Sequence, residues 1–265
     1  RAAQQFVQLL DETQVLHKAT GIKILLYGSL AKTGKGHGTD IAILLGLSGD
    51  DPVTFDVSAI DDKIAGIKAA SELWLGAEHR IPFSFDEDLL FLYNEQLPFH
   101  PNAVTFQAFL NDGHAVSETY YSIGGGFVVK EGAQGMSKTE VDLPFPIETA
   151  GDLLHWCLKT GLKISEVVLE NEAAWRSEQD TRDGILNIFR VMKECMYRGC
   201  HTTGYLPGGL NVARRAATLN HRLIGTHPYQ NFDEWVMAIR ETGGGFKNTL
   251  DWVSCFALPV NGDNA

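Results

Sequence analysis

The chain has 265 residues, of which 44% are hydrophobic, 21% charged and 10% aromatic, and this is the composition of a globular protein. That length has room for one large domain or two small ones. Its 22 Lys and Arg residues against 33 Asp and Glu residues give a formal net charge of −11, which argues against nucleic-acid phosphate or an anionic membrane as the main partner. No apolar run approaches the roughly 20 residues that cross a bilayer, and no signal-peptide pattern opens the chain. We therefore expect a cytoplasmic protein whose partners are small molecules or other proteins.

The chain begins with patterns of both helix and strand. An amphipathic helix is predicted up to about Lys18, and a nearly continuous apolar run predicts a buried strand at 22–27. A glycine-rich loop is expected next. It leads to a helix around 41–45, which either Thr39 or Asp40 is placed to cap.

Further along, helical spacing gives way to strand spacing. Ser58 and Asp61 match a capping box and predict a helix that continues to a stop at Gly76. From Ile81 apolar residues alternate, and Asn-Asp-Gly at 111–113 is a hairpin signal. Strands are predicted at 81–85, 89–92, 104–108, 116–121 and 127–129. A meandering antiparallel sheet with packed helices accounts for this half, and the fold class is therefore α+β.

The second half has the pattern of helices alone. Glycines and polar residues at 130–140, followed by Pro144 and Pro146, mark a boundary, and we expect a β domain at 1–143 and a helical segment at 144–265. Helices are predicted at 148–159, 165–176, 181–198, 212–224, 232–241 and 248–258.

The four cysteines do not have the spacing of a disulfide framework or a metal site. Cys157, Cys195, Cys200 and Cys255 lie in helix-like sequence without a CxxC pair. On one helix, five residues rotate the side chain by roughly 140°, so Cys195 and Cys200 point apart. We interpret all four as small buried side chains and assign no metal ligand in this chain.

The glycine-rich segment YGSLAKTGKGHGTD, residues 27–40, is the strongest local candidate for chemistry. It departs from the phosphate-binding pattern GxxxxGK[ST] and from the dinucleotide pattern GxGxxG. One interpretation is that Lys35, His37 and the helix N–H groups meet a ligand carboxylate while Asp40 meets an amino group. The other is that Thr39 and Asp40 only cap the helix and His37 faces water.

A second candidate lies on the predicted helix near Val168. If Ile164, Val167, Val168 and Trp175 form its buried stripe, Asn171 lies at the centre of that stripe and Glu172 at its edge. A buried amide or carboxylate needs partners. Asn171 and Glu172 therefore either tie two helices together or line a site.

Taken together, six segments of the chain resemble the iron–sulfur-dependent L-serine dehydratases (L-serine ammonia-lyases) of the single-chain bacterial type. The matching strings are YGSLAKTGKGHGTDIAILLGL at 27–47, LPFHPN at 97–102, YYSIGGGF at 120–127, ENE at 170–172, LPGGLNVARRA at 206–216 and DWVSCFALPVNGDNA at 251–265. They extend over essentially the whole chain, and their combination is far more specific than any single string.

The resemblance implies a β domain similar to the serine-binding regulatory domain of some phosphoglycerate dehydrogenases, followed by a helical catalytic domain. It implies a lyase that converts L-serine to pyruvate and ammonia with a [4Fe–4S] cluster in place of pyridoxal phosphate, acting as a homodimer. His37 is then a catalytic candidate, and Lys35, Thr39, Asp40, Asn171 and Glu172 are candidates for binding substrate. The alternative is a non-catalytic module that binds L-serine or serves assembly.

The chain departs from the family at both ends. The family's GPSSSHT segment would precede Arg1, and its three cluster cysteines would follow the segment that matches NGDNA. We therefore expect a piece of a longer enzyme that carries no cluster ligands and shows no turnover by itself.

Overall fold

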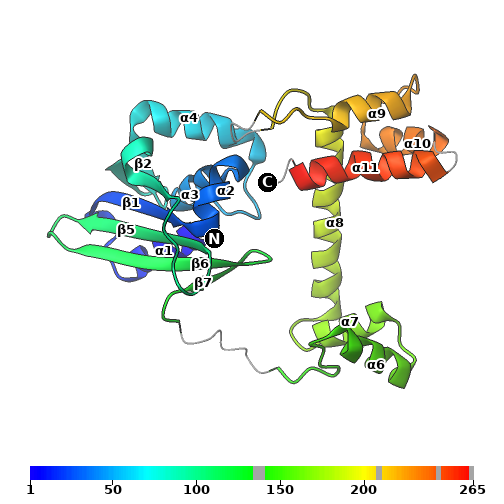
Figure 1. Ribbon diagram of the computed structural model, residues 1–265, viewed down its shortest axis with the longest axis horizontal. Coiled ribbons are helices and arrows are strands. Elements are labelled where there is room, and N and C mark those ends of the chain that lie inside the picture. Colours follow the sequence, from blue (N-terminus) through cyan, green and yellow to red (C-terminus); the bar gives the residue numbers. More distant parts are fainter. Residues whose placement is uncertain (134–140, 207–210, 243–245, 263–265) are drawn as a thin grey trace. The chain divides into compact units, whose positions relative to one another are not determined.

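The computed structural model describes residues 1–133, 141–206, 211–242 and 246–262 (Figure 1). The chain divides into two compact units: residues 1–133 belong to the first, and residues 141–206 and 212–262 belong to the second. The predicted domain boundary at 143 stays a prediction. The loops predicted from glycines at 207–209 and 243–245 lie outside the described residues.

A five-stranded sheet in the order β4-β1-β5-β6-β7 forms the centre of the first unit. Its strands are β1 (Ala19–Tyr27), β4 (Leu89–Leu92), β5 (Asn102–Leu110), β6 (Ala115–Gly124) and β7 (Phe127–Lys130). The predicted hairpin is confirmed, because β5 and β6 pair in antiparallel fashion around Gly113, whose φ is +85°. The other pairs are also antiparallel except at the β4 edge, where β4 runs parallel to β1.

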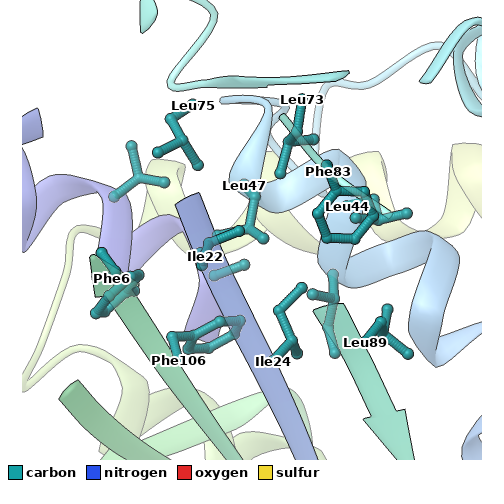
Figure 2. Packing of buried hydrophobic residues seen from close by; sticks show 14 of the residues in the cluster. Phe6, Ile22, Ile24, Leu44, Leu47, Leu73, Leu75, Phe83, Leu89 and Phe106 are labelled. Carbon is teal, nitrogen blue, oxygen red and sulfur yellow. The ribbon is translucent and has the colours of Figure 1, made fainter. Parts of the chain in front are cut away.

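Helices of the first unit bury their apolar side chains against this sheet. They are α1 (Ala2–Glu12), α2 (Gly28–Gly34), α3 (Thr39–Leu47), α4 (Ile60–Ala70) and the short α5 (Phe85–Asp88). Figure 2 shows Phe6 of α1 and Leu44 and Leu47 of α3 close to Ile22, Ile24 and Phe106 of the sheet, and the rings of Phe6 and Phe106 stack at 5.2 Å. Burial alternates along β1, where Ile22, Ile24 and Leu26 are buried, so one face of the strand packs in the core.

The structure shortens two of the predicted helices. The first ends at Glu12, where the Thr13 hydroxyl donates to the Leu9 carbonyl, rather than near Lys18. The helix predicted to reach Gly76 ends at Ala70, and the chain continues into β2 (Glu72–Leu75), which pairs with β3 (His79–Pro82). Leu73 and Leu75 are buried while Trp74 between them is 50% exposed, which is the period of a strand and not of a helix.

The predicted capping box at Ser58 is also wrong. Asp56 accepts hydrogen bonds from the backbone N–H and the hydroxyl of Ser58 and so begins a 3-10 turn that leads into α4. The carboxylate two residues upstream is therefore the group that fixes this helix start.

Across the described part of the second unit the regular elements are helices, as predicted. They are α6 (Ala150–Thr160), α7 (Ile164–Glu172), α8 (Glu178–His201), α9 (Ala216–Ile224), α10 (Phe232–Thr242) and α11 (Phe246–Gly262). Thr149 and Asp152 form a capping box at α6, and Ser177 caps α8. Trp235, Trp252, Cys200 and Cys255 lie in the buried cluster that joins the last helices. Within the described residues, every helix is too short or too polar to cross a membrane.

Candidate functional site

The glycine-rich segment is helical, and not the loop that its composition predicts. Residues 28–34 form α2, Lys35–His37 form a 3-10 turn, and Gly38 adopts a left-handed conformation with φ of +66° before α3 begins. At Gly28, where φ is +52°, a Cβ atom would lie 2.5 Å from the Pro101 carbonyl oxygen. Gly28 is therefore required for close backbone packing, which accounts for this glycine without a ligand.

Three of the segments that carry the resemblance converge at this point. The backbone N–H of Ser29 donates to the Pro101 carbonyl at 2.9 Å, and this joins the start of α2 to the segment LPFHPN. The ring of Phe99 packs on that of Tyr121 with centroids 4.8 Å apart, which adds the segment YYSIGGGF. Tyr27 and Tyr121 are both buried in one small apolar cluster. The segments 27–47, 97–102 and 120–127, which are far apart in the sequence, are thus in contact with one another in one neighbourhood of the first unit.

Asp40 does not serve as the helix cap. Gly38 occupies the N-cap position of α3, and Asp40 lies in the first turn of that helix. Among the described residues its Oδ1 atom is buried and has no hydrogen-bond partner. A buried polar atom without a partner carries a cost of about 1–3 kcal/mol. Neither Thr39 nor Asp40 caps α3 by a side-chain hydrogen bond, so that part of the second interpretation is wrong, whereas His37 is exposed as the same interpretation expected.

Asp40 shares a pocket of about 540 Å³ with Lys35. The same pocket is lined by Lys68 near the end of α4, by Ser84 directly before α5 and by Asp86 within α5. Lys68 Nζ lies 4.6 Å from the centroid of the Phe85 ring, which holds the ammonium group beside the pocket. The pocket therefore offers both carboxylate and ammonium groups to a small charged ligand.

His37 and Thr39 lie on the same stretch of chain but are not among the lining residues of that pocket. The His37 side chain is exposed, and the half-buried Thr39 side chain lies next to Gly34. Lys68, Ser84 and Asp86 were not predicted from the sequence, because they come from α4 and the start of α5, and no local pattern links those elements to Asp40.

In the second unit, Asn171 is buried and Glu172 is not. The Asn171 amide accepts from the Phe145 N–H at 2.9 Å and donates to the Phe145 carbonyl at 2.7 Å. Glu172 forms an ion pair with Arg176 one turn later, with 3.3 Å between Oε2 and Nε. Asn171 therefore ties α7 to the segment before α6.

The apolar stripe predicted for this helix is largely wrong. Val167 is fully buried, whereas Ile164, Val168 and Trp175 are 60%, 44% and 51% exposed. α7 also ends at Glu172, before Trp175 is reached. The spacing identified a helix but not the face that this chain buries.

The cysteines do not supply three thiolates at one place. The Sγ atoms of Cys200 and Cys255 are in contact. Cys195 Sγ instead donates to the Pro259 carbonyl at 3.5 Å, and Cys157 lies on α6. In the described part of the chain, no group of three His, Cys, Asp or Glu side chains is arranged to hold a metal ion. These residues therefore do not fit a [4Fe–4S] cluster, because the enzymes that the sequence resembles hold that cluster through three cysteines.

Comparison with known families matches both units. The family described as "Serine dehydratase beta chain" matches residues 1–133, and "Serine dehydratase alpha chain" matches residues 159–265. The two matches follow one another along the chain and leave residues 134–158 between them.

Individual relatives match along the whole chain. An L-serine dehydratase of Streptomyces coelicolor is 40% identical over 269 residues, L-serine dehydratase 1 of Escherichia coli is 37% identical over 267, and an L-serine dehydratase of Haemophilus influenzae is 37% identical over 268. Each alignment covers 100% of this chain and 56% of the relative. The chain thus spans about half the length of the curated relatives it matches.

Proposed function

The chain belongs to the serine dehydratase family, and from that premise we propose that it forms part of an L-serine ammonia-lyase, which converts L-serine to pyruvate and ammonia. The observation that carries this proposal is the pair of family matches, one to each unit. The names of the curated relatives support the same substrate.

We assign the Asp40 pocket to the charged groups of the substrate. L-serine carries an ammonium and a carboxylate group at neutral pH. The buried Oδ1 of Asp40 is an acceptor without a partner among the described residues, and Lys35 contributes a cation to the same pocket. Asp40 would bind the ammonium group and Lys35 the carboxylate, each by a charge-assisted hydrogen bond.

His37 is the proposed catalytic residue, and Thr39 a proposed substrate-binding residue. Loss of water from serine requires removal of the α-proton, and imidazole is the side chain that most often serves as a general base. Asn171 and Glu172 are weaker proposals for substrate binding, because their polar atoms already bond to Phe145 and Arg176.

The proposed cofactor is a [4Fe–4S] cluster of the intact enzyme, with no pyridoxal phosphate. Since the cysteines of this chain do not fit such a cluster, we place its ligands outside the chain and assign none of its chemistry to the residues described. The intact enzyme is proposed to be cytoplasmic and homodimeric, in line with the resemblance.

The experiment replaces the matching region of the Streptomyces coelicolor relative by this chain. The hybrid is reconstituted anaerobically with iron and sulfide and assayed for pyruvate from L-serine. We expect the hybrid to form pyruvate and the isolated chain, treated identically, to form none. Turnover by the isolated chain would contradict our assignment of the cluster ligands to a region outside it.

The alternative is a module that binds L-serine or serves assembly without catalysis. It is favoured by the fact that the Asp40 pocket is lined entirely by residues of the first unit. Saturable binding of L-serine to the isolated chain by calorimetry, together with an inactive but correctly reconstituted hybrid, would select this alternative.

A further inference from the structure

Two thiols from different helices meet in the core of the second unit. Cys200 lies near the end of α8 and Cys255 lies within α11, 55 residues further along the chain. Their Sγ atoms are 3.6 Å apart, and the residues are 2% and 0% exposed. Neither residue is used by the proposed function.

The other two cysteines are not placed to compete for this contact. Cys195 Sγ donates to the Pro259 carbonyl at 3.5 Å, and Cys157 lies on α6 outside the buried cluster that contains Cys200 and Cys255. An S–S bond is about 2.05 Å long, so bond formation requires the two sulfur atoms to approach by about 1.5 Å. Rotation of both side chains, with a small movement of the helices, supplies an approach of that size.

A pocket of about 960 Å³ is lined by residues of the same helices. Its lining includes Gly199 and Ser254, which directly precede Cys200 and Cys255 in the sequence. It also includes Ala216, whose carbonyl oxygen accepts a hydrogen bond from Cys255 Sγ at 3.6 Å. Both thiols are buried and do not line this pocket, but Ala216, which contacts Cys255, does.

The contact between the two thiols also affects the pKa of Cys255. Its hydrogen bond with Cys200 lowers the pKa of the Cys255 thiol, while burial acts in the opposite direction. A lower thiol pKa increases the fraction of thiolate, which is the nucleophilic form.

We propose that Cys200 and Cys255 form an oxidisable dithiol, which small hydroperoxides convert into a disulfide between α8 and α11. The Cys255 thiolate attacks one oxygen of hydrogen peroxide, the O–O bond breaks, and the other oxygen leaves as water after it takes up a proton. Cys200 then attacks the sulfenic sulfur, the S–S bond forms, and the S–O bond breaks to release a second water. Two thiols lose two electrons, and one peroxide is reduced to two waters.

The test uses the wild-type chain, freed of reductant, folded and treated with hydrogen peroxide in slight excess. Remaining thiols are blocked with N-ethylmaleimide in denaturant, and the unreduced protein is digested and mapped by mass spectrometry. We expect the four titratable thiols to fall to two, with a cross-linked peptide that contains Cys200 and Cys255. Cys157→Ser should retain this cross-link and Cys200→Ser should lose it.

A sample oxidised in urea provides the control for specificity, because unfolding removes the preference for one pair. Retention of all four thiols in the folded chain would overturn the proposal. So would a cross-link through Cys157 or Cys195, or sulfinic acid at Cys255 without a cross-link. The mapping of the wild-type chain decides the matter even if a cysteine variant fails to fold.

Discussion

Asp40 has a buried oxygen with no hydrogen-bond partner in the described part of the chain, and it lines a pocket together with Lys35. A side chain retained only for stability has its acceptors satisfied, since an unpaired buried acceptor lowers the free energy of unfolding. Positions where polar groups are left unsatisfied are characteristic of functional sites. Substitution of Asp40 is therefore the most direct test of our substrate assignment.

Asp40→Asn should weaken the binding of L-serine without destabilising the first unit. Loss of the charged acceptor removes about 1.5–3 kcal/mol, which corresponds to a roughly 10- to 100-fold higher Kd. Calorimetry on the hybrid before reconstitution, which does not consume L-serine, measures the Kd, and thermal denaturation measures stability. The exposed Asp61→Asn on α4 is the matched control. An unchanged Kd in Asp40→Asn would remove this residue from the substrate site.

Asn171→Ala should lower the free energy of unfolding by about 1–3 kcal/mol, because both hydrogen-bonding groups of Phe145 lose their partner. Urea denaturation followed by circular dichroism gives the value. Gln179→Ala, which removes an exposed bond to Asp183 on α8, should change it by no more than about 0.5 kcal/mol. Equal effects of the two variants would show that the Phe145 contact contributes little.

Tyr120 and Tyr121 on β6 should make the first unit sensitive to alkali. Burial raises the pKa of Tyr121 to about 12, and the hydrogen bond that its hydroxyl donates to Glu131 Oε1 at 2.6 Å adds to the shift. Burial also raises the pKa of Tyr120 to about 12. Because both folded pKa values exceed the ordinary value of 10.0, this stability is fully present below pH 10 and is lost as the pH rises through 12.

Urea denaturation at several pH values between 9 and 12 tests this dependence. The free energy of unfolding should fall with pH above 10, and Tyr121→Phe should make the decline shallower because one of the two shifted groups is gone. An identical slope in the variant would show that Tyr121 ionises equally in the folded and unfolded states.

At the scale of elements, α2 is a helix in a segment whose composition predicted a loop. Glycines at 28, 34, 36 and 38 predicted a loop, yet close packing against Pro101 and Thr39 stabilises helical and 3-10 turns there. Glycine lowers intrinsic helix propensity, but tertiary contacts decided the conformation in this case.

Two glycine substitutions separate close approach from backbone conformation. Gly28→Ala combines a φ of +52° with a Cβ atom 2.5 Å from the Pro101 carbonyl oxygen, whereas Gly38→Ala has a φ of +66° and open space around its Cβ. The left-handed conformation alone costs about 1–2 kcal/mol. We expect Gly38→Ala to lower the free energy of unfolding by that amount and Gly28→Ala to lower it further. Equal losses in the free energy of unfolding would mean that the backbone at Pro101 moves away from the added Cβ atom at little energetic cost.

Strand and helix positions were largely predictable from periodicity, while their partners were not. The alternation at 104–108 and the Asn-Asp-Gly turn identified β5 and its hairpin, because both signals are local. The parallel pairing of β4 with β1 joins residues such as Ile24 and Leu89, which are far apart in the sequence. Lys68 and Asp86 were missed at the Asp40 pocket for the same reason.

At the scale of the whole molecule, each unit has its own buried core and its own family match. The six dispersed strings identified the family, and three of them now form one neighbourhood around Tyr27 and Tyr121. The functional roles of the six site residues stay predictions: His37, Lys35, Thr39, Asp40, Asn171 and Glu172.

Pyruvate formation by the reconstituted hybrid is the decisive measurement for the proposed lyase activity. We expect the hybrid with the native sequence to convert L-serine to pyruvate and ammonia, and we expect Asp40→Asn and His37→Ala in the same hybrid to reduce this rate greatly. A hybrid that folds and takes up its iron and sulfide but forms no pyruvate would show that this chain does not form part of an L-serine ammonia-lyase.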